Sequence, residues 1–267
     1  MRLRIEHKTK FTYDEPITEA YTEMRLKPSD AGGQHCLSFS LVTEPRGNVM
    51  QYQDRFGNDV RHFDVLMPHQ TVSVTAVSEV LTPQRLLLPE AELTPVDEHD
   101  YLMPTSYSPL TERLRHFVEP LVIKDDPLRT ANTIMEVIFN QFKYEPSATD
   151  VKTTADEVLE LQRGVCQDFA HVMIAACRWA AIPSRYVSGY LYDPKLVGDN
   201  AASHAWVEVF IPGPGWIAFD PTHNRQQTDA YVRVGVGQDY ADVPPTRGTY
   251  KGKCQEKLDV KVSVRAV

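Results

Sequence analysis

The sequence predicts an α+β protein, with an antiparallel β-sandwich at the N-terminal side and a core of helices and strands after it. Three observations lead to this fold class. Over residues 1–80, short β-rich segments alternate with clusters of turn-forming residues. Between residues 110 and 180, hydrophobic residues recur at helical spacing instead. From residue 184 onward, strand-like segments and tight turns return.

Residues 1–100 are expected to form the β-sandwich domain. Leu3 and Ile5 alternate with charged residues, as in a strand with one buried face. Further strands are expected at 35–42, 50–53, 60–66 and 71–80, separated by turn clusters at 28–33, 45–48, 55–58 and 67–69. This region does not gather a nucleophile, a base and an acid, so we expect it to serve as a scaffold or to orient substrate.

Residues 82–110 are rich in proline and acidic residues, which favours a linker between two domains. The second domain is expected at 101–253. Its helices are predicted at about 110–118 and 127–142, where apolar side chains form one stripe, and after Thr154, which begins a capped segment.

The C-terminal segment, residues 254–267, predicts a strand that returns to the first domain. Residues Leu258 to Val264 are apolar at every second position, the same alternation that Leu3 and Ile5 show. Such a strand needs a sheet to pair with. We therefore expect it to complete the β-sandwich and to make the first domain discontinuous.

Charge and hydropathy indicate which classes of partner the protein is not expected to bind. The chain of 267 residues has 28 Lys and Arg against 36 Asp and Glu, a formal charge of −8, and no basic run, so we expect no nucleic-acid partner. No segment approaches the ~18 apolar residues of a membrane span, so we expect no membrane partner and a cytoplasmic location. The cysteines lie far apart without CxxC pairs, which favours reduced thiols over a zinc site: Cys36, Cys166, Cys177 and Cys254.

The stretch 163–171 places one of these cysteines where a helix is expected to begin. Gly164 provides the backbone freedom for a tight turn, and apolar residues at helical spacing follow Cys166. At a helix N-terminus, the macrodipole and the unpaired N–H groups favour a thiolate and can receive an oxyanion. Cys166 is thus a candidate nucleophile. A lone cysteine is more often a small packing residue, so its partners decide between the two interpretations.

Strands are expected after the helix at 184–192, 204–211 and 216–222, with a polar loop at 193–203. We expect Phe210 to pair with Trp216 across the turn between the last two strands. In that register Asp220 is a diagonal neighbour of His204 on one face of the hairpin. A slip of one residue would place the two side chains on opposite faces.

A thiol at a helix start, with a histidine and an aspartate on neighbouring strands, meets the requirements of thiol catalysis. Cys166 would attack a carbonyl as a thiolate, and His204 would accept and later return a proton. Asp220 would orient the imidazole and stabilise its charged form. The product of the first step is an acyl-enzyme thioester.

These segments resemble those of the transglutaminase-like superfamily. The resemblance rests on Gly164 to His171, Arg185 to Tyr190, His204 to Glu208 and Asp220 to Thr222, which are similar to the motifs of bacterial transglutaminase-like cysteine proteases. Residues 1–80 also resemble the bacterial transglutaminase N-terminal region, including Asp54 to Asn58, and residues 237–248 resemble the segment after the core. The resemblance implies a papain/transglutaminase-like core with Cys166, His204 and Asp220 as catalytic residues.

The chain departs from the animal cross-linking enzymes at two points. Those enzymes place Trp after the catalytic cysteine, where this chain has Gln167, and they use calcium, for which no EF-hand-type loop is present. The mechanism requires no metal and no cofactor. The Cys166 N–H is expected to be one oxyanion donor, and Gln162 or Gln167 the second. Trp206 either lines the cleft or belongs to the core.

The predicted function is acyl transfer through a cysteine thioester on a peptide or protein amide. Hydrolysis of a peptide, isopeptide or glutamine-type amide is favoured over transamidation, because nothing marks a site for a second, amine substrate. The alternative is an inactive module that binds a peptide or protein in the same cleft. A third interpretation is a metal-dependent hydrolase that uses His204, Asp220 and His223 as ligands.

Overall fold

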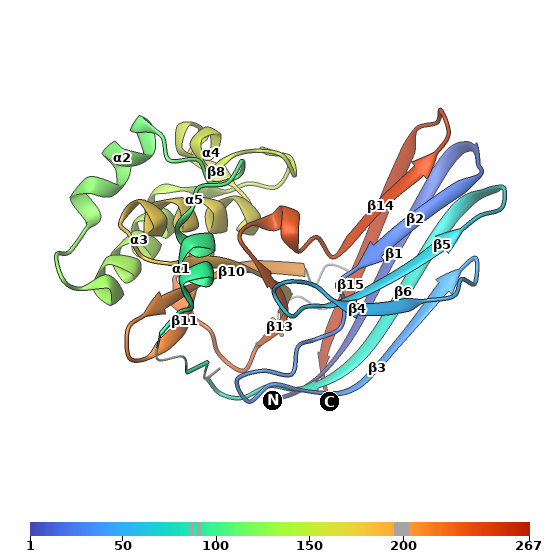
Figure 1. The fold of residues 1–267 in the computed structure, drawn as a ribbon, viewed down its shortest axis with the longest axis horizontal. Coiled ribbons are helices and arrows are strands. Elements are labelled where there is room, and N and C mark those ends of the chain that lie inside the picture. The colour runs from blue at the N-terminus through green and yellow to red at the C-terminus, as the bar shows by residue number, and fades with distance from the viewer. Residues whose placement is uncertain (86–87, 90–91, 195–202) are drawn as a thin grey trace.

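The computed structural model describes residues 1–85, 88–89, 92–194 and 203–267, so most of the polar loop predicted at 193–203 lies outside the described residues. Figure 1 shows two parts side by side, a body of long paired strands and a body in which helices cover a sheet. The strand body contains two four-stranded antiparallel sheets, with strand orders β15-β1-β6-β3 and β14-β2-β5-β4.

The strands of this body agree closely with the segments expected from turn spacing. Their bounds are β1 Arg2–Ile17, β2 Glu19–Met24, β3 His35–Glu44, β4 Met50–Gln53, β5 Asp59–Val65, β6 His69–Leu81, β14 Thr246–Lys251 and β15 Glu256–Ala266. Two of them, β2 and β14, are not anticipated by the sequence analysis. They pair with each other, and β14 falls inside the range 101–253 that was expected to form the second domain.

The C-terminal strand β15 pairs with β1 along its whole length, from Leu3 opposite Ala266 to Tyr13 opposite Glu256. The alternating apolar side chains of β15 lie in two different environments. Val262 and Val264 are buried, whereas Leu258 and Val260 are 53% and 46% exposed. The division of the chain near residue 100 stays a prediction.

One face of the β15-β1-β6-β3 sheet packs against two partners, the helix-containing body and the second sheet of the strand body. Near the start of β1, Leu3 and Ile5 form an apolar cluster with Tyr190, Val232 and Val234 of the helix-containing body. Further along the same face, Phe11 and Tyr13 belong to the core between the two sheets of the strand body. Because side chains alternate along a strand, the residues between these two clusters, His7 and Thr9, point the same way.

The helix-containing body is built on a five-stranded sheet of order β12-β11-β10-β9-β13. Its strands are β9 Ser184–Leu191, β10 Ser203–Ile211, β11 Gly215–Asp220, β12 Arg225–Gln226 and β13 Tyr231–Gly237, and a short parallel pair joins β7 Lys143–Tyr144 to β8 Arg163–Gly164. The helices are α1 Pro95–Leu102, α2 Glu112–Val118, α3 Pro127–Gln141, α4 Ala155–Leu161 and α5 Cys166–Trp179, with 3-10 turns at Glu119–Leu121 (η1) and Tyr240–Asp242 (η2).

Helix α5 is the centre of this body, since it packs on β9 and β10 and is covered by α2, α3 and α4. Its side chains from Asp168 to Arg178 are all buried. The capped start of α4 is confirmed, because Thr154 and Glu157 form a capping box. The proline-rich linker contains a helix, α1, that the sequence analysis does not anticipate. Pro95 occupies its first turn, where a missing N–H costs nothing, and Thr94 caps it.

Among the described residues, no helix is both long enough and apolar enough to span a membrane.

Candidate active site

The start of α5 is fixed by Asp168, whose side chain folds back over the first turn. Its Oδ2 accepts hydrogen bonds from the N–H of Val165, 2.7 Å away, and from Oγ1 of Thr149, 2.6 Å away. A Cβ on Gly164 would lie 2.5 Å from the same oxygen. Gly164 is thus required for the close approach of Asp168. Its φ is not in the left-handed region, so backbone freedom, expected from the sequence, is not the reason.

This geometry places Cys166 at the first position of the helix, with its side chain partly exposed. The first N–H groups of a helix have no partner within the helix, so the N–H of Cys166 is available to an oxygen in front of it. The candidate nucleophile and one candidate oxyanion donor therefore belong to the same residue.

The register expected for the β10–β11 hairpin is confirmed, with Phe210 opposite Trp216. It brings Nε2 of His204 to 2.8 Å from Oδ2 of Asp220, and both side chains are buried. Because Nε2 is engaged by Asp220, Nδ1 is the ring nitrogen left for Cys166. Cys166 and His204 line the same pocket, and interactions with Cys166 are among the causes that raise the pKa of His204.

Electrostatics favour a charged pair of His204 and Asp220. Burial alone lowers the pKa of His204, but the charge of Asp220 and its hydrogen bond, followed by the interactions with Cys166, outweigh burial and raise the pKa from 6.5 to about 10. Burial raises the pKa of Asp220, and the opposing charge and hydrogen bonds of His204 and His223 bring it well below its ordinary value. At neutral pH the imidazolium and the carboxylate therefore coexist.

Two further side chains hold Asp220, and the sequence analysis anticipates only one of them as a neighbour. Nδ1 of His223 lies 2.8 Å from Oδ2 of Asp220, and the hydroxyl of Tyr231 donates to the same oxygen over 2.5 Å. Nε of Arg225 donates to the Tyr231 oxygen over 2.9 Å. Tyr231 comes from β13, a strand with no motif of its own, so no sequence signal points to it.

The metal interpretation requires ligand atoms that lie close together. One such atom each from His204, Asp220 and His223 lies within 4.8 Å of the others, so this requirement is met. Oδ2 of Asp220, however, already receives hydrogen bonds from both histidines and from Tyr231. A cation there would displace three short hydrogen bonds and the imidazole that faces Cys166. The residues fit a hydrogen-bonded carboxylate better than a metal site.

A pocket of about 250 Å³ opens in front of the thiol, between the two bodies. It is lined by the start of α5, the strands β9 and β10 and the turn η2 on one side, and by β1, β14 and β15 on the other. The lining residues are His7, Thr9, Val165, Cys166, Gln167, Tyr186, Ser188, Ser203, His204, Ala205, Tyr240, Pro245, Thr246, Leu258 and Val260. None of these described residues is Asp, Glu, Lys or Arg.

Of the other sequence-predicted site residues, the structure places only Gln167 in this pocket. Gln162 ends α4 in a left-handed conformation, is exposed and does not line the pocket, so its assignment as an oxyanion donor stays a prediction. Trp206 is fully buried behind His204, with the two rings stacked at 6.0 Å between centroids. Of the two environments predicted for Trp206, the cleft and the core, the structure shows the core.

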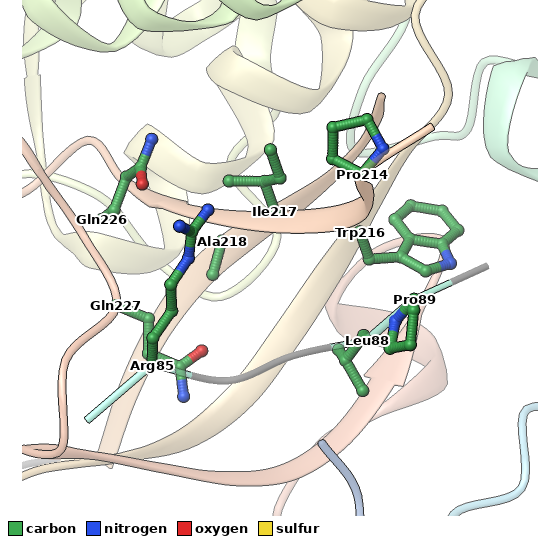
Figure 2. Close-up of a pocket in the computed structure, with 9 residues that line it drawn as sticks. All are labelled: Arg85, Leu88, Pro89, Pro214, Trp216, Ile217, Ala218, Gln226 and Gln227. Atoms are coloured by element: carbon green, nitrogen blue, oxygen red, sulfur yellow. The ribbon is translucent and has the colours of Figure 1, made fainter. Parts of the chain in front are cut away.

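A second pocket, of about 160 Å³, contains none of the candidate catalytic residues. Figure 2 shows it beside β11, with Arg85, Trp216 and Gln227 among the side chains that line it. Cys166 and His204 both line the first pocket, so that pocket is the candidate active site.

Known proteins resemble this chain along its whole length. Residues 115–221 match the Transglutaminase-like superfamily, and residues 3–81 match the Bacterial transglutaminase-like N-terminal region. An uncharacterized protein of Mycobacterium leprae is 33% identical over 275 residues, which cover 98% of this chain and 98% of that protein. A protein-glutamine gamma-glutamyltransferase of Pseudomonas aeruginosa is 29% identical over 149 residues, 48% of this chain and 22% of that protein.

Among solved structures, a "putative cysteine protease" from Cytophaga hutchinsonii superposes with a TM-score of 0.77. It is 21% identical in sequence, and the match covers 100% of this chain and 92% of that one. This likeness confirms the predicted fold class, an α+β protein with sheets in its N-terminal region and a transglutaminase/papain-like core.

Proposed function

The chain belongs to the transglutaminase-like superfamily, and from that premise we propose that it is a thiol-dependent acyl-transfer enzyme acting on amides of peptides or proteins. The observation that carries the proposal is the buried hydrogen bond between His204 and Asp220, because it leaves the other imidazole nitrogen facing Cys166 in an open pocket. In this proposal Cys166 is the nucleophile, His204 the general base and acid, and Asp220 the group that orients it.

The proposed reaction has two steps. The Cys166 thiolate forms a bond to the amide carbon, and the carbonyl electron pair moves to oxygen, where the Cys166 N–H receives it. When the carbonyl re-forms, the C–N bond breaks and the leaving amine takes a proton from His204. Water or a second amine then attacks the thioester, gives its proton to His204 and releases the acyl product with the thiolate restored.

We propose hydrolysis as the main outcome, with a peptide, isopeptide or glutamine-type amide as the donor. The described lining contains no carboxylate that would draw a lysine ammonium toward the thioester. Transamidation is the second candidate reaction, and the named similarity to a glutamyltransferase over 48% of the chain favours it. The cytoplasmic location stays a prediction from sequence.

The test is the rate of alkylation of Cys166 by iodoacetamide, followed by peptide mass mapping between pH 5 and pH 9. Cys36 is an internal reference in every sample, because burial raises the pKa of its thiol. We expect Cys166 to react faster than Cys36 below pH 7, and His204→Ala to remove the difference. Equal rates for both cysteines in the unmodified protein would favour the alternative, an inactive binding module in the same cleft.

A further inference from the structure

The active-site pocket interrupts an otherwise apolar strand face. Along β1 the residues that point toward the neighbouring layers are Leu3, Ile5, His7, Thr9, Phe11 and Tyr13, and all six are buried. The two polar members, His7 and Thr9, lie where the pocket opens. Buried polar side chains are costly unless they are hydrogen-bonded, so their partners indicate what they do there.

A chain of hydrogen bonds runs from the protein interior to the pocket through these two residues. The hydroxyl of Tyr190 lies 2.9 Å from Nδ1 of His7, and Nε2 of His7 lies 3.2 Å from Oγ1 of Thr9. Oγ1 of Thr9 in turn lies 3.3 Å from Oγ1 of Thr246, at the start of β14. Burial lowers the pKa of His7 to about 4, so its ring is neutral at pH 7 and has one donor and one acceptor nitrogen.

Each buried donor needs an acceptor, and this requirement fixes which residue donates in each of these hydrogen bonds. Tyr190 is buried, and among the described residues its hydroxyl has His7 as its side-chain hydrogen-bond partner. If Tyr190 only accepted, its O–H would stay buried without an acceptor, which costs about 1–3 kcal/mol. Tyr190 therefore donates to Nδ1 of His7, Nε2–H of His7 donates to Thr9, and Thr9 donates to Thr246. Among the described residues, no further member of this hydrogen-bond series accepts the hydroxyl proton of Thr246, which lines the pocket, so that proton is free to point into the pocket.

We propose that Thr246 is a substrate-binding residue that donates a hydrogen bond to the carbonyl oxygen of an uncharged acyl donor, with Tyr190, His7 and Thr9 as its positioning residues. The inference rests on the proposed function, because the same pocket must hold the amide that Cys166 attacks. It extends that function by assigning part of the substrate cleft to the β-sandwich. A carbonyl-bearing substrate is the class that such a donor selects. The described residues that line the pocket include no Asp, Glu, Lys or Arg, which agrees with an uncharged acyl donor.

Two thiol reagents separate carbonyl binding from thiol reactivity. Iodoacetamide carries an amide carbonyl beside the carbon that Cys166 attacks, whereas 4,4′-dithiodipyridine has no carbonyl. In Thr246→Val we expect iodoacetamide labelling of Cys166 to slow by about three- to tenfold, the factor that one neutral hydrogen bond is worth. The dithiodipyridine rate should stay unchanged, and Thr246→Ser should restore the iodoacetamide rate. Thr249→Val, an exposed position on the same strand, is the matched control and should change neither rate.

Tyr190→Phe tests the direction of the chain without touching the pocket. Without this O–H, each hydrogen bond of the series can also form in the opposite direction, with Thr246 donating to Thr9 instead of to the substrate. The rate of iodoacetamide labelling should therefore fall part of the way toward that of Thr246→Val. Normal rates in both Thr246→Val and Tyr190→Phe, or equal losses with both reagents, would overturn the inference while Cys166 remained fast. A Cys166 that is slow in the unmodified protein would instead overturn the proposed function.

Discussion

The indole of Trp206 lies against Gly189 on the neighbouring strand, so closely that a Cβ on Gly189 would come within 2.5 Å of the indole Cη2. The other side of the same position is closed by the carbonyl oxygen of Val232, 2.2 Å from that Cβ. Trp206 also stacks on His204, at 28° between the ring planes. The space at Gly189 therefore sets how deeply the indole sits and, through it, where the imidazole lies.

Gly189→Ala should displace Trp206 and with it His204. We expect the free energy of unfolding to fall by at least about 1–3 kcal/mol, the usual cost of overpacking, and Cys166 to lose its fast alkylation. Urea unfolding and iodoacetamide labelling measure the two effects. Gly248→Ala is the control, because its Cβ would lie 3.7 Å from the nearest atom. Similar results for both variants would show that the indole is not held by this contact.

Asp168→Ala should remove the cap that fixes the start of α5. The variant leaves the N–H of Val165 and the hydroxyl of Thr149 without their acceptor, so we expect a loss of about 1–2 kcal/mol and slower labelling of Cys166. Thr154→Ala removes the cap of α4 and should cost about 1 kcal/mol without slowing Cys166. Equal labelling rates in the two variants would mean that the cap serves stability alone.

Asp220→Asn should move the alkylation profile of Cys166 toward alkaline pH. The charge of Asp220 and its hydrogen bond are the main causes that offset burial at His204, so without them the pKa of His204 falls. Less imidazolium is then present at neutral pH, and we expect labelling at pH 6 to fall by about tenfold. Labelling between pH 5 and pH 9 gives the profile, with Asp229→Asn as a surface control. An unshifted profile would argue against the ion pair.

Stability should depend on pH through the same pair. Because the folded protein raises the pKa of His204 to about 10, its stabilising contribution is complete below pH 6.5 and is lost as pH rises toward 10. Asp220, whose pKa is lowered, contributes above its ordinary value of 3.8 and loses this contribution in acid. The free energy of unfolding, measured against His204→Gln from pH 6.5 to 10, should converge with that of the variant. A constant difference would contradict this linkage.

Leu258→Ser should alter substrate preference and leave the fold intact. Leu258 is 53% exposed and lines the pocket opposite Cys166, so its apolar surface is available to a substrate side chain. We expect peptides with an apolar residue beside the cleaved amide to show a raised KM, with kcat and the thermal midpoint nearly unchanged. Val262→Ser, at a buried position of the same strand, should instead lower the thermal midpoint.

Local sequence signals predict much of this molecule. The helix start at Cys166, the capping box at Thr154 and the pairing of Phe210 with Trp216 all depend on contacts between residues close along the chain. Period-two alternation also predicts a strand within residues 254–267, and the observed strand β15 pairs with β1. Such alternation of apolar and polar residues indicates which face of a strand is buried.

The misses depend on contacts between distant segments. Tyr231 contacts Asp220 although β10 and β9 lie between their strands in the sheet, and Thr246 contacts Thr9 across 237 positions of sequence. Neither tyrosine nor threonine has a local pattern that distinguishes such a role from ordinary packing. Gly164 was predicted correctly as a required glycine but for the wrong reason, because only the folded position of Asp168 shows the crowding.

The strand β15 forms a wall of the pocket, and it is the last part of the pocket to be synthesised. A ribosome makes His7, Cys166 and His204 well before Leu258, and β1 has only β6 beside it until β15 emerges. A nascent chain can therefore carry the thiol before it carries the complete cleft. The order of strands along the chain therefore makes β15 the wall of the pocket that is put in place last.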